Sequence, residues 1–186
     1  MTVGPPFDDV LTAAQAGADW AIEVLYKDLN PPLLRYLRSK APAVAEDLCS
    51  EVWLSAAQKL KSFTGDEDGF RSWIFTIARR RVIDHVRQVS RRRTDPVDHE
   101  LFDRRSSVDD TADAGTQAVS AREAIAQLTA GLPPDQAEVV LLRVVAGLDV
   151  ATVAGMMGRS EGSVRVLQHR ALRRMAKQLG PMAGRL

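Results

Sequence analysis

Apolar residues in the first half of the chain recur every three or four positions, the spacing of helices that bury one face. This pattern predicts helices over residues 7–16, 19–29, 33–40, 44–61 and 70–89. Gly17 and the Pro31-Pro32 pair are expected to separate the first three helices. Residues 62–69, with the sequence SFTGDEDG, have the composition of a loop.

The helix predicted over residues 70–89 combines an apolar stripe with a strongly basic surface. The positions expected to face a core are Phe70, Trp73, Ile74, Ile77, Ala78, Val82 and Val86. Between residues 70 and 93 there are eight arginines and one acid, Asp84. Two interpretations stay open at this point: a solvated basic face, or a surface that follows a nucleic-acid backbone by neutralising its phosphates.

The second half carries another single apolar stripe, which predicts one more helix. Its members are Ala137, Val140, Leu141, Val144, Val145 and Leu148. Pro133-Pro134 suits the first turn of this helix and Gly147 suits its end. We find no segment with the alternating pattern typical of strands. The sequence therefore predicts an all-α protein.

Two further helices follow, joined by a tight turn. Asp149 is a candidate N-cap for a short helix over residues 150–157, Gly158 permits a sharp turn, and Ser160 is a candidate N-cap for the last helix. On that last helix Val164, Leu167, Ala171 and Met175 share one side, and Arg165, His169, Arg170 and Arg173 share the other. This is the plan of a helix-turn-helix, whose second helix enters the DNA major groove. The alternatives are a helical hairpin with a solvated face, or a helix-turn-helix used for protein contacts.

The uneven distribution of charge divides the chain. The net charge is +1, but residues 94–119 hold two basic and seven acidic side chains, a net charge of −5. This acidic stretch, rich in Asp, Ser and Thr, is predicted to be a flexible linker between a domain over 1–93 and a domain over 120–186. A single cysteine, no signal-peptide pattern and no long apolar run favour a cytoplasmic protein.

No group of residues indicates catalysis. The three histidines are scattered, and one cysteine cannot form a zinc site. The GDEDG sequence at 65–69 lacks the Lys-Ser/Thr of a nucleotide-binding loop. We therefore expect neither a metal nor a cofactor, and a protein that is not an enzyme.

Two motifs, in one order along the chain, resemble one family. AEDLCSEVW (residues 45–53) and FRSWIFTIARRRVIDHVRQVSRR (residues 70–92) resemble region 2 of the extracytoplasmic-function (group IV, sigma-70 family) sigma factors of bacterial RNA polymerase. The stretch from Leu132 to Met175 resembles region 4 of the same family. The resemblance implies a sigma factor that binds core RNA polymerase, directs it to promoters and helps open the DNA at the −10 element. Catalysis would then belong to the polymerase. No region 1 pattern precedes region 2 and no region 3 fits between the halves, as expected of this short class.

The resemblance also assigns residues and partners. It implies that region 2 docks on the clamp helices of the polymerase β′ subunit through Glu46, Asp47, Leu48, Glu51 and Trp53. For the −10 element, in double- or single-stranded DNA, it implies Ser62, Phe63, Thr64, Arg71, Trp73, Arg79, Arg80, Asp84 and Arg87. For the −35 element, it implies Ser160, Glu161, Ser163, Arg165, Val166, His169, Arg170 and Arg173. Ser50, Arg80 and Val166 depart from residues common in the family. Contact with the polymerase β subunit and with an anti-sigma factor is implied as well.

A second class of protein competes with this interpretation. A free-standing transcription regulator could sense or dimerise through its first domain and bind DNA through the helix-turn-helix alone. Such a regulator has no need of the basic, aromatic helix over 70–89 beside the AEDL stretch. That feature favours the sigma factor.

Overall fold

The structure is a computed structural model, and it describes residues 5–94 and 129–183. Both ranges are built from helices, and neither contains a strand. The prediction of an all-α protein is therefore confirmed. Apart from Thr94, the predicted linker over 94–119 lies outside the described residues.

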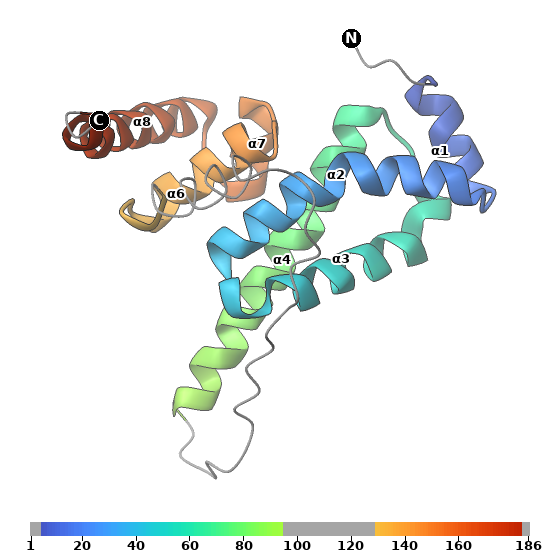
Figure 1. The fold of residues 1–186 in the computed structure, drawn as a ribbon, viewed down its shortest axis with the longest axis horizontal. Helices are drawn as coiled ribbons and strands as arrows, with labels where there is room; N and C mark the ends of the chain where they lie inside the picture. Colours follow the sequence, from blue (N-terminus) through green and yellow to red (C-terminus); the bar gives the residue numbers. More distant parts are fainter. Residues whose placement is uncertain (1–4, 95–128, 184–186) are drawn as a thin grey trace.

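Four α-helices form the first part of the molecule. They are α1 (Phe7–Gln15), α2 (Asp19–Lys40), α3 (Ala45–Lys59) and α4 (Glu67–Thr94), with short 3₁₀ turns η1 (Pro42–Val44) and η2 (Leu60–Ser62) on either side of α3. Helices α2, α3 and α4 pack against one another, and α1 packs across the start of α2 (Figure 1). Leu33, Val52, Ile74 and Phe75 are fully buried among these helices.

The Pro31-Pro32 pair lies inside α2, so the prediction of two helices over 19–29 and 33–40 is wrong. Each proline removes one backbone hydrogen bond from a helix interior. Leu29 and Leu33 flank the pair and are almost completely buried against the bundle. Burial of this continuous apolar face keeps the helix intact through the prolines.

The loop predicted over 62–69 is shorter than expected, because Ser62 ends η2 and α4 begins at Glu67 rather than Phe70. The side chain of Asp66 accepts a hydrogen bond from the backbone N–H of Gly69 at 2.8 Å. Asp66 therefore acts as the N-cap of α4. An aspartate followed by two further acids is a helix-start signal that was present in the sequence.

From Pro134 onward, the described residues of the second part form three α-helices and a π-helical turn. They are α6 (Pro134–Val140), the π-turn η3 (Leu141–Val145), α7 (Val150–Met157) and α8 (Glu161–Ala183). The helix predicted from the apolar stripe is present, but Val144 is 59% exposed and not in the core. A π-turn bonds residue i to i+5 and so shifts the phase of the stripe by one residue.

Val86 is the other residue wrongly predicted to face a core, since it is 55% exposed. The last core residue of α4 is Val82, and beyond it the helix extends past α2 and α3 (Figure 1). The apolar stripe continues in the sequence, but no neighbouring helix of the bundle covers it there.

The two parts of the molecule are packed together. Helix α2 contacts η3, and buried apolar side chains of both parts form one continuous cluster. In Figure 1, α6 lies beside the C-terminal half of α2, where its Glu138 contacts Tyr36 and Lys40. Within the described ranges, none of the helices has the length and apolarity that a membrane span requires.

Candidate partner and nucleic-acid interfaces

The surface between α2 and α3 is organised by a single side-chain oxygen. Oδ1 of Asn30 accepts hydrogen bonds from the indole Nε1 of Trp53 at 3.1 Å and from the thiol of Cys49 at 3.2 Å. The Trp53 ring also packs on Tyr26, with their centroids 5.0 Å apart. These residues line a groove of about 370 Å³. Trp53 is therefore held in one orientation at the surface.

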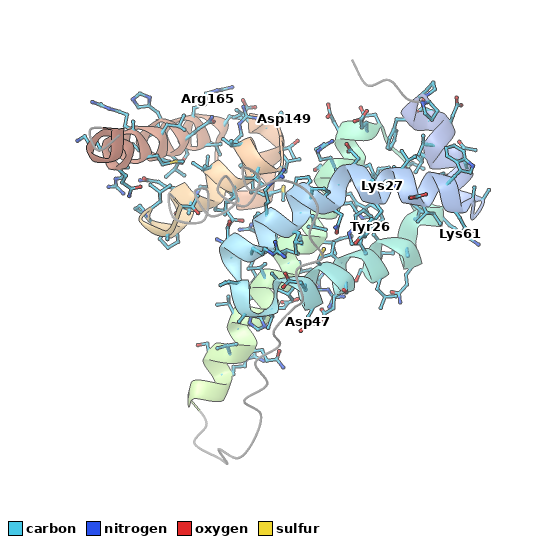
Figure 2. The ribbon with its side chains drawn as sticks, viewed as in Figure 1. Tyr26, Lys27, Asp47, Lys61, Asp149 and Arg165 are labelled. Atoms are coloured by element: carbon cyan, nitrogen blue, oxygen red, sulfur yellow. The ribbon has the colours of Figure 1, made fainter. Side chains whose placement is uncertain are left out.

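The residues expected to contact the polymerase divide between this surface and the core. Glu46, Asp47 and Glu51 are exposed, and Asp47 stands in the first turn of α3 (Figure 2). Glu46 accepts from Nη2 of Arg38 at 2.7 Å, which lowers the pKa of the Glu46 carboxyl. Nη1 of Arg81 lies 3.4 Å from Glu51. Arg38 and Arg81 therefore partly neutralise the acidic face formed by Glu46, Asp47 and Glu51.

Leu48 is only 5% exposed and packs in the core, so it supports this face from behind. Tyr26, which the sequence analysis missed, is 45% exposed beside Trp53 (Figure 2). Ile22, one turn earlier on α2, is exposed as well. The signal available in the sequence was this apolar pair, Ile22 and Tyr26, four positions apart on a helix face outside the core.

Cys49 provides a direct test of the groove. Burial, with a smaller contribution from the Glu46 charge, raises the pKa of its thiol from 9.0 to about 11. Only the thiolate reacts with iodoacetamide, so at pH 8 the folded protein should be alkylated roughly 100-fold more slowly than the chain unfolded in urea. Equal rates for the folded and unfolded protein would show that the thiol is not held as described.

A cluster of aromatic rings lies where α4 begins. Phe63 stacks on Trp73 with centroids 5.0 Å apart and planes at 28°, and Phe70 packs edge-on against Phe63 at 5.3 Å. Phe70 is buried, whereas Phe63 and Trp73 are half-buried and Thr64 is exposed. Ser62, also exposed, precedes them at the end of η2. The cluster thus presents ring surface next to a polar loop.

The loop carrying Phe63 is fixed from the N-terminal side. Nε2 of Gln15, on α1, donates to the carbonyl oxygens of Leu60 at 3.0 Å and Phe63 at 2.8 Å. A Cβ at Gly65 would come within 3.1 Å of the Phe63 ring, so a glycine lets the chain turn closely around it. Gln15 was not among the predicted site residues, because its two acceptors are more than 40 positions away.

The arginines predicted to contact the −10 element have different environments. Arg71 is paired with Asp28 on α2 at 2.9 Å, which ties it to the bundle. Arg80 is 85% exposed, with Asp84 one turn along at 4.0 Å. Arg79, Arg80, Asp84 and Arg87 line one hollow of about 300 Å³ together with Met156 of α7. The predicted set therefore forms two groups, one around the aromatic cluster and one facing the second part of the molecule.

The end of the chain has the helix-turn-helix geometry that the sequence predicts. Gly158 adopts φ 63°, the left-handed conformation that glycine permits at a helix end. The Ser160 hydroxyl accepts from the backbone N–H of Ser163 at 3.3 Å, as an N-cap does. Val164 and Ala171 are fully buried against the preceding helices.

The exposed face of α8 contains most of the residues predicted for −35 DNA. Glu161, Arg165, Val166, His169, Arg170 and Arg173 are exposed, and Ser163 is half-buried. Nη2 of Arg165 lies 2.7 Å from Oε2 of Glu161, one turn earlier. This ion pair orients the Arg165 guanidinium over the N-terminal turn of the helix. Figure 2 shows Arg165 and Asp47 on separate parts of the molecule.

Arg143, on the π-turn, braces this helix-turn-helix and was missed in the sequence. Its Nε donates to Oε1 of Gln168 on α8 at 3.3 Å, and its Nη1 donates to the backbone oxygen of Leu148. Arg159, in the turn, pairs with Asp135 at the start of α6. In the sequence, the position of Arg143 inside the apolar LLRVV stretch indicated that its side chain has a hydrogen-bond partner within the protein.

The N-cap predicted at Asp149 is present: its carboxylate accepts from the Thr152 backbone N–H at 2.7 Å and from the Thr152 hydroxyl at 2.8 Å. Asp149→Ala should lower the free energy of unfolding by about 1 kcal/mol near neutral pH, and Asp149→Asn should lower it much less. The hydrogen bonds from Thr152 lower the pKa of Asp149 below its ordinary 3.8. The difference between wild type and Asp149→Ala should therefore disappear as the pH falls through that lowered pKa. Urea denaturation at several pH values measures it, and a difference unaffected by acid would contradict the cap.

Comparison with known proteins agrees with this arrangement. Residues 25–92 match the family described as Sigma-70 region 2, and residues 122–175 match Sigma-70, region 4. The chain is 35% identical over 173 residues to the ECF RNA polymerase sigma factor BldN of Streptomyces coelicolor, covering 92% of this chain and 65% of BldN. It is 32% identical over 186 residues to the ECF RNA polymerase sigma factor SigD of Mycobacterium tuberculosis, covering 95% of this chain and 85% of SigD.

Solved structures show the same fold. CnrH, determined in complex with the cytosolic domain of CnrY, aligns with a TM-score of 0.61 and 19% identity over 92% of this chain and 96% of CnrH. The sigma factor RpoE of Bartonella quintana, in complex with the anti-sigma factor NepR, aligns with a TM-score of 0.63 and 22% identity over 86% of this chain and 96% of RpoE.

The chain belongs to the ECF sigma factors, the sigma-70 family proteins that direct RNA polymerase to promoters. The described part from α2 to α4 corresponds to region 2, and the part from α6 to α8 corresponds to region 4. Among the described residues, no group of three or more His, Cys, Asp and Glu side chains could hold a metal ion.

Proposed function

We propose that this sigma factor uses three separate surfaces to bring core RNA polymerase to a promoter. The groove between α2 and α3, together with the neighbouring exposed Asp47, binds the polymerase clamp helices. The aromatic cluster and the arginines of α4 bind −10 DNA, and the exposed face of α8 binds −35 DNA. The observation that carries the proposal is the presence of a fixed aromatic loop and a capped basic helix-turn-helix on one chain.

The aromatic loop has the properties of a site for an unstacked base. Phe63 and Trp73 offer ring faces for stacking, and base–aromatic stacking does not depend on one particular base. The contacts from Gln15 hold the loop before DNA binds, so little conformational entropy is lost on binding. A regulator that binds duplex DNA through a helix-turn-helix alone has no use for such a site.

We further propose that the chain divides into region 2 over 1–93, a linker over 94–119 and region 4 over 120–186. The protein itself is non-catalytic and works in the cytoplasm, where the polymerase carries out the chemistry. Because RpoE was determined with the anti-sigma factor NepR, and CnrH with the cytosolic domain of CnrY, an anti-sigma factor is proposed as a further partner here.

Asp47→Arg tests the polymerase surface. The substitution reverses an exposed charge next to Glu46, which lines the groove, without touching the core, and like charges brought together in an interface cost several kcal/mol. The affinity for core polymerase should fall by about tenfold or more. Titration of fluorescently labelled protein with core polymerase measures it.

Asp9→Arg is a matched control, because Asp9 is also an exposed acid in the first turn of a helix, on α1. Both variants lose the same favourable interaction with a helix dipole. If Asp9→Arg weakens polymerase binding as much as Asp47→Arg does, the effect is one of overall charge and the proposed surface is wrong.

A further inference from the structure

Glu138 stands out because it is a charged side chain in the interior. It lies on α6 of region 4 and is 7% exposed, and no other carboxylate or cation in the described ranges is buried to that degree. A buried carboxylate is costly unless its oxygens are paired. The groups that pair with the Glu138 carboxylate therefore indicate its role in the protein.

All three partners of Glu138 come from region 2. Its Oε2 lies 2.6 Å from Nζ of Lys40, at the end of α2. Its Oε1 accepts from the hydroxyl of Tyr36 at 3.0 Å and from Nε of Arg79 at 3.2 Å. Two cations and one hydroxyl thus surround both oxygens. This ion-pair cluster joins two regions whose connecting segment lies outside the described residues.

The three donors form a built site rather than a chance surface contact. Tyr36 is fully buried, and its ring packs edge-on against Phe75 with centroids 5.7 Å apart. The core of region 2 therefore fixes the position of the hydroxyl. Burial and the neighbouring Glu138 charge raise the pKa of Tyr36, which keeps this hydroxyl protonated and able to donate. Lys40 and Arg79 converge on the same point from α2 and α4.

We infer that Tyr36, Lys40 and Arg79 form an anion site on region 2 which Glu138 occupies as an interdomain latch, and which a DNA phosphate takes when the two regions separate. Without Glu138, the two cations Lys40 and Arg79 would lie beside the Tyr36 hydroxyl with no counter-charge, so the open form favours another oxyanion at this point. Arg80 and Arg87 line the adjoining hollow together with Arg79 and would extend such a site along a phosphate backbone. Closure and DNA binding through Arg79 are then mutually exclusive. The phosphate step rests on the proposed role of Arg79 in DNA binding, and the latch does not.

The latch is tested on the full chain without DNA or polymerase. Fluorophores on the exposed positions Gln58→Cys and Ala151→Cys report the distance between α3 and α7. They attach selectively to these introduced cysteines, because the buried Cys49 thiol reacts slowly. Glu138→Gln keeps the shape and removes the charge, and should shift energy transfer from one short distance to a broad, longer distribution. Lys40→Gln should do the same from the side of region 2.

Asp135→Asn is the matched control, since Asp135 lies one turn earlier on α6 and pairs with Arg159 inside region 4. It should leave the distance unchanged. Circular dichroism establishes that each variant is folded. If folded Glu138→Gln and Lys40→Gln both keep the short distance of the wild type, Glu138 is not a latch.

The phosphate step is tested with a single-stranded oligonucleotide that carries no promoter sequence. If about one molecule in ten is open, Glu138→Gln should bind it about tenfold more tightly than the wild type. Adding Arg79→Gln should remove this gain and reduce the slope of affinity against salt by about one. An opened variant that binds the oligonucleotide no better than the wild type would show that the site takes no phosphate. Capture of an acidic peptide in place of the oligonucleotide would overturn that step too.

Discussion

Replacing Trp73 by alanine is expected to slow promoter opening by about 5- to 150-fold while leaving binding to −35 DNA unchanged. Trp73 supports Phe63 by stacking at 5.0 Å, and these two half-buried rings form the more accessible side of the aromatic cluster, since Phe70 is buried. Stacking of a base on an aromatic side chain contributes about 1–3 kcal/mol, which corresponds to this range of rates. Permanganate reactivity of unpaired thymines in the holoenzyme–promoter complex measures opening over time.

Two variants separate stacking from a general loss of stability. Trp73→Phe keeps an aromatic face and should recover most of the opening rate. Trp20→Ala removes another half-exposed tryptophan, on α2 and outside the proposed site, and should open promoters like the wild type. Normal opening by a folded Trp73→Ala variant would remove the aromatic cluster from the −10 site.

Arg165→Ala and Arg173→Ala are expected to fail in different ways. Arg165 stands near the start of α8, where major-groove readers place their base contacts, and Glu161 orients its guanidinium at 2.7 Å. An arginine that binds guanine through two hydrogen bonds gives about 1–3 kcal/mol of discrimination. Arg165→Ala should therefore relax preference at one or two positions of the −35 element and leave binding to scrambled DNA nearly intact.

Arg173 lies two turns further along the same exposed face and is better placed for a phosphate. Arg173→Ala should weaken binding to every sequence and reduce the slope of log affinity against log salt concentration by about one. Lys177→Ala, near the end of α8, serves as the control for loss of a positive charge. Affinities for −35 and scrambled DNA across a salt series distinguish these outcomes. If Arg165→Ala and Arg173→Ala lose affinity equally on both DNAs, the assignment of Arg165 to base recognition and of Arg173 to a phosphate contact is wrong.

Local patterns in the sequence were enough for the all-α class, for most of the helices and for the orientation of α8. The caps at Asp149 and Ser160 and the turn at Gly158 each depend on residues within three or four positions. The exposed face with Arg165 and Arg173 follows from helical periodicity alone. The same reasoning failed where packing between distant segments outweighs local preference, as at Pro31-Pro32 inside α2.

The fixed geometry of the sites depends on contacts that no local pattern reveals. Gln15 holds the loop at Phe63 across 48 positions, and Tyr36 reaches Glu138 across 102. The phase shift that exposes Val144 comes from a π-turn, and a regular helical wheel cannot anticipate it. Asn30 directly precedes the Pro31-Pro32 pair, but nothing in that local sequence reveals that its side chain fixes both Trp53 and Cys49.

The central claim is that this chain gives RNA polymerase its choice of promoter. The most direct measurement is transcription by purified core polymerase from a library of promoter sequences, with and without the protein. With the protein, transcripts should start from a subset of templates that share a −35 and a −10 element, and Asp47→Arg should abolish them. Without it, the same templates should give no specific starts. If core polymerase produces the same transcripts whether or not the protein is present, the chain is not a promoter-selecting subunit and the proposed function is wrong.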